Sequence, residues 1–131
     1  MDEVKIHSGT RVKMKKLDED TLSPDFYTSL REFALKQESV EAVYLFALQP
    51  EGQEEQICLA LAIRKTFFGK QDEEFLRLVD EVQLLLPSDL SLNLYRFGAS
   101  DLLARFCLES LEPAYVSGPN WLGKQVKKYL R

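Results

Sequence analysis

The stretch that decides the fold is VEAVYLFALQPEGQEEQICLALAIRK, residues 40–65. Residues 40–48 are apolar at nearly every position, and residues 56–65 open with a similar run. Continuous apolar runs of this length are typical of central strands buried on both faces. The polar loop between them contains Pro50 and Gly52, so the two runs predict a β-hairpin.

The second strand of this hairpin has one bulky side and one small side. The small side consists of Cys58, Ala60 and Ala62. Alanine allows a neighbouring element to approach closely, and the aromatic residues of the first strand would be unfavourable in water. We therefore expect the helix at residues 100–110, the C-terminal segment or a second subunit to cover this face.

Towards the N-terminus, the sequence predicts an arm, a half-buried strand and a helix. Residues 1–8 form the arm. Residues 9–17 alternate between apolar and basic side chains, which is the period of a strand with one face in water. Ser23 and Pro24 supply an N-cap and a proline at the first helical position, so a helix is expected from Pro24 to about Gln37.

Towards the C-terminus, a helix, a strand and another helix are expected. The segment at residues 70–86 has an acidic start, a wide apolar stripe at helical spacing and a proline directly after it. Residues 90–97 alternate again, and the third helix begins near Ser100. The residues of the fourth strand expected to face inward are Leu90, Leu92 and Leu94.

The expected fold class is α+β, with a four-stranded, mainly antiparallel sheet packed with helices in the order β-α-β-β-α-β-α. Residues 9–116 form one domain, and residues 117–131 form a basic C-terminal amphipathic tail. A ferredoxin-like arrangement is compatible with the first six elements. It would place the strand at residues 9–17 in the middle of the sheet, although that strand has a one-sided pattern. The strand order therefore stays open.

The C-terminal tail is the clearest candidate for binding. After Pro119 it can form about three helical turns with an apolar face and a largely basic opposite face. Such a helix can dock on its own acidic domain, bind or exchange with a partner chain, or lie on an anionic membrane. All three remain open, with the membrane least favoured. The candidate partner-binding residues are Trp121, Leu122, Lys124, Val126, Lys127, Tyr129 and Leu130.

The charge distribution separates this tail from the rest of the chain. The net charge is −4, and the tail carries four of the 17 cations and no acid, which leaves −8 for residues 1–116. An acidic body argues against nucleic acid as a partner. The start of the chain has no apolar segment typical of a secretory signal, and two cysteines in apolar runs favour a reducing compartment. We therefore expect a cytoplasmic protein.

Few side chains suit catalysis or metal binding. His7 is the one histidine and lies in the expected arm. A general base needs a fixed position close to the proton that it removes, and a terminal arm does not provide one. Cys58 and Cys107 lie on different elements and do not have zinc-site spacing. We read both as core residues, with thiol chemistry at one of them as the alternative. No metal, cofactor or catalytic residue is predicted.

Several of these features together resemble a known family. They are Gly9-Thr10 opening the strand RVKM, a helix that starts at a proline, the phrase SVEAVYLFAL, an acidic helix and the closing Glu112-Pro113-Ala114-Tyr115. Over residues 8–115 this pattern is similar to the C-terminal domain of the SseB (enhanced serine sensitivity) family. The resemblance implies a bacterial cytoplasmic protein and transfers no catalytic residue.

The preferred function is a non-catalytic protein-interaction or assembly module, which binds a protein partner or a second copy of itself. The alternative is an enzyme or accessory factor in amino-acid or sulfur metabolism with a cleft that the sequence does not reveal. A pocket with convergent polar groups and a shifted pKa would favour the enzyme. A shallow surface with an apolar patch would favour the module.

Overall fold

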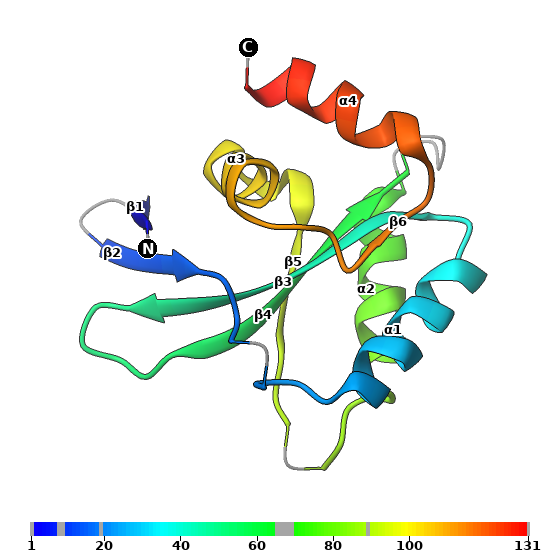
Figure 1. Cartoon of the computed structure of the whole chain (residues 1–131), viewed down its shortest axis with the longest axis horizontal. Helices are drawn as coiled ribbons and strands as arrows, with labels where there is room; N and C mark the ends of the chain where they lie inside the picture. Colours follow the sequence, from blue (N-terminus) through cyan, green and yellow to red (C-terminus); the bar gives the residue numbers. More distant parts are fainter. Residues whose placement is uncertain (1, 8–9, 19, 65–69, 89, 131) are drawn as a thin grey trace.

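A mixed β-sheet with helices on both faces forms the centre of the molecule in the computed structural model, which describes residues 2–7, 10–18, 20–64, 70–88 and 90–130 (Figure 1). The strands are β1 (Asp2–His7), β2 (Thr10–Lys15), β3 (Val40–Pro50), β4 (Gln56–Ile63), β5 (Asn93–Arg96) and β6 (Tyr115–Val116). The helices are α1 (Pro24–Lys36), α2 (Gln71–Gln83), the short 3₁₀ helix η1 (Phe97–Ala99), α3 (Asp101–Ser110) and α4 (Pro119–Tyr129).

The strand order is β1-β2-β3-β4-β5, and β6 pairs with β3. All pairs are antiparallel except β4 with β5. A parallel pair needs a crossover connection, which α2 provides. Strand β3 is long enough to share one edge between two neighbours, β2 near its C-terminal end and β6 near its N-terminal end. The predicted α+β class with a mainly antiparallel sheet is confirmed.

The two faces of the sheet carry two separate cores, because successive residues of a strand point to opposite sides. Val43, Leu59 and Leu61 pack with α1 and α2 in an aliphatic core. Tyr44 and Phe46 pack with α3 and α4 in an aromatic core. The small residues Cys58, Ala60 and Ala62 lie in this second core, so the third helix and the C-terminal segment together cover the small side, as the sequence suggested.

Helices α1 and α3 begin where the sequence places their caps. The Ser23 hydroxyl accepts from the Phe26 amide at 3.2 Å, and the Ser100 hydroxyl accepts from the Leu103 amide at 3.1 Å. Helix α2 ends earlier than expected, since it stops at Gln83 and turns follow it. The fourth strand is also shorter than residues 90–97, because η1 begins at Phe97.

Two expectations differ from the structure. Most of the expected N-terminal arm is strand β1, in which Val4 pairs with Val12 of β2. Pairing satisfies the backbone groups along an otherwise open edge of β2. The sheet is also not ferredoxin-like, because β2 lies outside the β3–β4 hairpin and not in the middle of the sheet. The one-sided pattern of residues 9–17 is that of a peripheral strand.

Candidate functional site

Helix α4 lies across the aromatic core and forms one wall of the candidate site (Figure 1). It starts at Pro119, whose missing N–H is tolerated at the first helical position. Trp121 and Tyr129 are 6% and 9% exposed, so the helix is anchored by one aromatic side chain near each end. Their spacing places both on the same face of the helix.

The anchors pack on aromatic rings from β3 and η1. The Trp121 ring centre lies 5.3 Å from that of Phe97 and 6.3 Å from that of Tyr44. Tyr129 packs edge-on against Phe97 at 5.8 Å. Arg105 of α3 donates from Nε to the Tyr129 carbonyl oxygen at 3.0 Å, which satisfies a carbonyl that has no partner within the helix. Of the three positions considered for the tail, the structure shows the one docked on its own domain.

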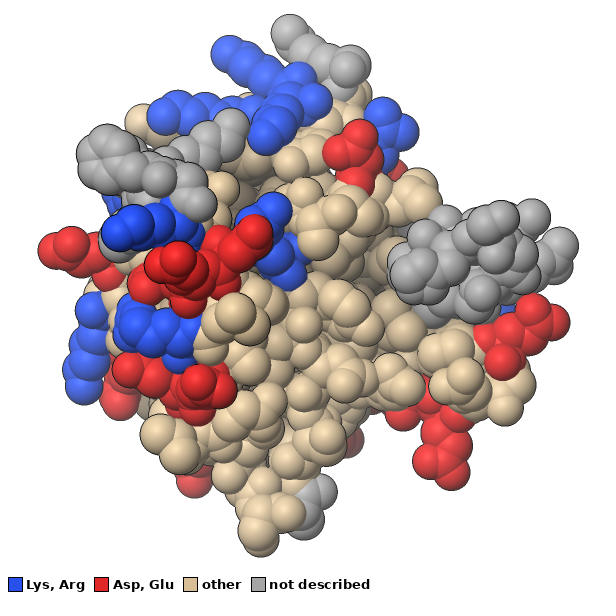
Figure 2. Space-filling view, turned by 180° about the vertical axis from the view of Figure 1, so that it is seen from behind, with Lys and Arg blue, Asp and Glu red and all other residues tan. Residues whose placement is uncertain are grey.

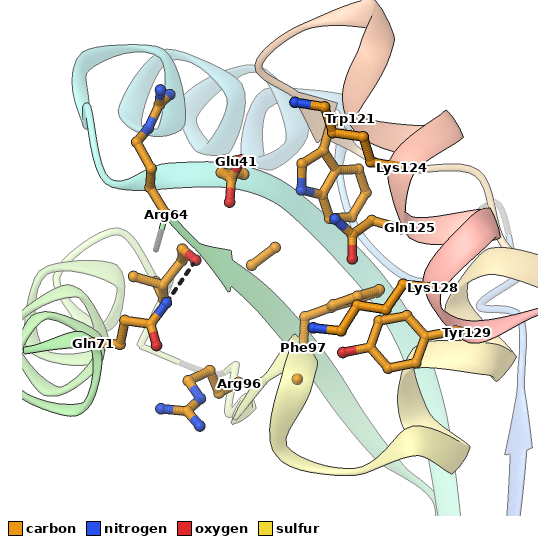
Figure 3. A pocket seen from close by; sticks show the side chains of 13 residues that line it. Glu41, Arg64, Gln71, Arg96, Phe97, Trp121, Lys124, Gln125, Lys128 and Tyr129 are labelled. Atoms are coloured by element: carbon orange, nitrogen blue, oxygen red, sulfur yellow. Dashed lines mark hydrogen bonds between the residues drawn. The ribbon is translucent and has the colours of Figure 1, made fainter. Parts of the chain in front are cut away.

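A pocket of about 530 Å³ lies between α4, the end of β4 and the start of α2 (Figure 3). Ala62, Ile63 and Phe97 contribute apolar surface, and α4 contributes the Trp121 and Tyr129 rings. In Figure 3 the Lys128 side chain extends from α4 towards the open middle of the pocket. The remaining lining residues are Glu41, Arg64, Gln71, Arg96, Gly98, Lys124 and Gln125.

The pocket carries more positive than negative charge. Four cations line it, namely Arg64, Arg96, Lys124 and Lys128, against the single carboxylate of Glu41 among the described lining residues. Arg96 pairs with Asp72 of α2. In the part of the chain that the structure describes, the other three cations form no ion pair with a carboxylate. The lining therefore favours an anionic group.

Neighbouring contacts hold several of these polar groups in place. Arg64 donates from Nε to the Glu38 carbonyl oxygen at 2.9 Å, and Gln71 donates to the Ile63 carbonyl oxygen at 3.4 Å. The Lys128 ammonium lies 5.1 Å from the centre of the Tyr129 ring, which is within range of a cation–π interaction.

The two thiols lie apart from the pocket lining, in the aromatic core, and both are fully buried. Burial raises the pKa of Cys58 and of Cys107 to about 12. A nucleophilic cysteine needs a depressed pKa and solvent access, so neither thiol has the environment for that role. His7 belongs to β1, and its side chain lies outside the described residues. Among the described residues, no cluster of His, Cys, Asp or Glu could hold a metal ion.

The predicted partner-binding residues divide between the two sides of α4. Trp121 and Tyr129 are buried inside, and Leu122 and Leu130 are half-buried against the aromatic core. The residues of this set that remain exposed are Lys124, Val126 and Lys127. Figure 2 shows Lys and Arg side chains gathered at the top of the molecule, where α4 lies in Figure 1.

Sequence reasoning missed the pocket and its residues outside the tail. Arg96 is remote in the sequence from Arg64 and Gln71, and the three residues belong to no common motif. Lys128 belongs to the basic side of the tail helix and is exposed, and it also lines the pocket. A basic residue at the end of each of two adjacent strands, Arg64 directly after β4 and Arg96 as the last residue of β5, was the one signal available, and it does not by itself identify a pocket.

Comparison with protein families gives one match. Residues 6–116 match the family model described as SseB protein C-terminal domain. The match covers β2 to β6 and α1 to α3 but ends before α4, the helix that forms one wall of the pocket. No curated protein and no solved structure matches the chain. Within the described residues, no helix combines the length and the apolar character needed to cross a membrane.

Proposed function

The chain belongs to the SseB protein C-terminal domain family, and on this premise we propose that it is a non-catalytic protein-interaction module. Its binding surface is the outer face of α4, defined by Lys124, Val126 and Lys127. The partner presents an acidic segment that also carries an apolar residue. The family domain supplies the scaffold, and the tail, residues 117–131, supplies the contact.

The observation that carries this proposal is what α4 leaves exposed after it has docked. Its large aromatic residues are buried, yet Val126 stays 40% exposed, and Lys124 and Lys127 are exposed one helical turn apart. No ion pair joins Lys124 or Lys127 to a carboxylate in the described part of the chain. Complementary charge steers association, and apolar contact adds affinity. A basic strip beside an exposed apolar side chain therefore suits an acidic and partly apolar segment.

Two further observations concern the cysteines. The first argues against a nucleophilic thiol, and the second supports a reducing compartment. Both thiols are buried, with their pKa raised by burial, and in the described structure both cysteines are free of disulfides. Buried free cysteines fit a reducing environment. On this ground we propose a cytoplasmic location.

The test is the binding of a fluorescein-labelled peptide of alternating Glu and Leu, followed by fluorescence polarisation. We expect saturable binding that weakens as salt is added, because the attraction is between exposed charges. Binding should weaken about tenfold in Lys127→Glu, which replaces an attraction with a repulsion. The same peptide with Gln in place of Glu should bind poorly.

Lys36→Glu is the matched control. Lys36 is also an exposed lysine in the last turn of a helix, but it belongs to α1, which packs in the aliphatic core on the other face of the sheet. Equal weakening in both variants would mean that only net charge matters, and it would contradict the proposal. Analytical ultracentrifugation tests self-association. A dimer lost in Lys127→Glu would identify a second copy as the partner.

A further inference from the structure

We infer that the pocket between α4 and the end of β4 is a binding site for a small organic anion. The ligand carries a carboxylate or phosphate group on a compact apolar body. This site shares Lys124 with the outer face of α4, whereas Val126 and Lys127 are not among the described residues that line the pocket.

The size and the mixed lining of the pocket fit such a ligand. Its volume of about 530 Å³ lies within the range of small-molecule sites. One part of the lining is apolar, from Ala62, Ile63 and Phe97, and it continues into the Trp121 ring. Sites of this kind combine apolar walls with a few polar groups that fix the orientation of the ligand.

The charged groups identify the ligand as an anion. Lys124 and Lys128 come from α4, while Arg64 follows β4 on the opposite side (Figure 3). Lys128 extends towards the middle of the pocket, whereas the Arg64 guanidinium points away from the middle, and its Nε donates to the Glu38 carbonyl oxygen (Figure 3). Hydrogen bonds from cationic donors to carboxylate or phosphate are among the strongest in proteins. Glu41 and Gln71 add an acceptor and an amide at the edge.

The pocket also lies where the family domain meets the tail, and both parts of the chain line it. The lining up to Gly98 belongs to the region matched by the family model, and the lining from Trp121 onward belongs to α4. A ligand that contacts both sides binds only while α4 is docked, so its binding stabilises the docked position of α4.

The experiment titrates the protein with phenyl phosphate at constant ionic strength. The reporter is the fluorescence of Trp121, the one tryptophan in the chain, which lines the pocket. We expect a saturable change. Inorganic phosphate should bind more weakly because it has no apolar body, and benzyl alcohol should give no saturable change because it has no charge. Benzoate separates the two anions: preference for benzoate assigns a carboxylate site, and preference for phenyl phosphate assigns a phosphate site.

Two neighbouring lysines provide a matched pair of variants. Lys128→Glu should weaken binding by about tenfold or more, because it replaces a charged donor in the pocket. Lys127→Glu has the same charge change on the same helical turn and should stay within about twofold of wild type. The Arg64→Glu variant removes a pocket cation that does not belong to α4. It therefore tests the same expectation as Lys128→Glu even if that variant detaches the helix.

Three results would overturn the inference: no saturable change with either aromatic anion, an equal response to benzyl alcohol, or equal loss in Lys127→Glu and Lys128→Glu. The proposal that the outer face of α4 binds an acidic segment can fail independently of this inference. It requires the acidic peptide to lose affinity in Lys127→Glu, and the anion titration requires Lys127→Glu to retain it.

Discussion

Tyr44 is the residue around which the aromatic core is built. It is fully buried, its ring stacks on Phe97 with centres 5.8 Å apart, and Trp121 lies against it. Its hydroxyl has no hydrogen-bond partner among the described residues. Burial raises the pKa of this hydroxyl, and the nearby Cys107 thiol raises it further. The ring therefore stabilises the core, whereas the hydroxyl does not.

The Tyr44→Phe variant separates these two contributions. It removes a buried polar group without a partner and keeps the ring, so we expect the free energy of unfolding to stay the same or to rise by about 1 kcal/mol. Tyr44→Ala removes the ring as well and should lower that free energy by about 3–5 kcal/mol. Urea denaturation measures both. A loss of more than about 1 kcal/mol in Tyr44→Phe would show that the hydroxyl is satisfied by a hydrogen bond.

At the scale of an element, α4 depends on a small number of contacts. Two aromatic anchors, the half-buried Leu122 and Leu130, and one hydrogen bond from Arg105 connect it to the remainder of the aromatic core. The Arg105 bond is made at the C-terminal end of the helix, where carbonyl groups lack intrahelical partners and positive charge is favourable. We expect this bond to control how often the end of α4 opens.

Arg105→Ala should speed amide hydrogen exchange in α4 by about fivefold, because it removes a bond worth about 1 kcal/mol. The central strands β3 and β4 should keep their exchange rates. Arg31→Ala is the control, since Arg31 makes the same type of bond, from Nε to the Ala114 carbonyl oxygen at 3.0 Å, away from α4. Faster exchange in α4 after Arg31→Ala, or unchanged exchange after Arg105→Ala, would refute this role.

At the scale of the whole molecule, the aromatic core concentrates buried groups that can lose a proton. Tyr44, Cys58 and Cys107 all belong to it, and burial raises the pKa of each. In the unfolded chain a cysteine ionises near its ordinary pKa of 9.0, whereas in the folded chain both thiols stay protonated up to about 12. Folding is therefore linked to pH on the alkaline side.

We expect the free energy of unfolding to keep its full thiol contribution below about pH 9 and to fall as the pH rises towards 12. The sign follows because the unfolded chain releases these protons first. Urea denaturation at a series of pH values measures the slope. Replacing both cysteines with alanine should make the slope shallower. An unchanged slope in that double variant would mean that the thiols ionise equally in both states.

The sequence by itself determined the local structure of this protein. The two-faced runs predicted at residues 40–48 and 56–65 contain most of β3 and all of β4, and the caps at Ser23 and Ser100 became the starts of α1 and α3. The small side of β4 correctly predicted a closely packed cover. These features depend on residues near one another in the chain, so periodicity and capping chemistry are sufficient to identify them.

The tertiary structure alone decided the strand order, the pairing of β1 and the existence of the pocket. The cations of the pocket come from the end of β4, from β5 and from α4, which are far apart in the sequence. The tertiary structure also decided which side of α4 is buried, since an amphipathic pattern allows the helix to dock on its own domain or on a partner chain. Such features depend on how elements pack across the sheet, and no local pattern records that packing.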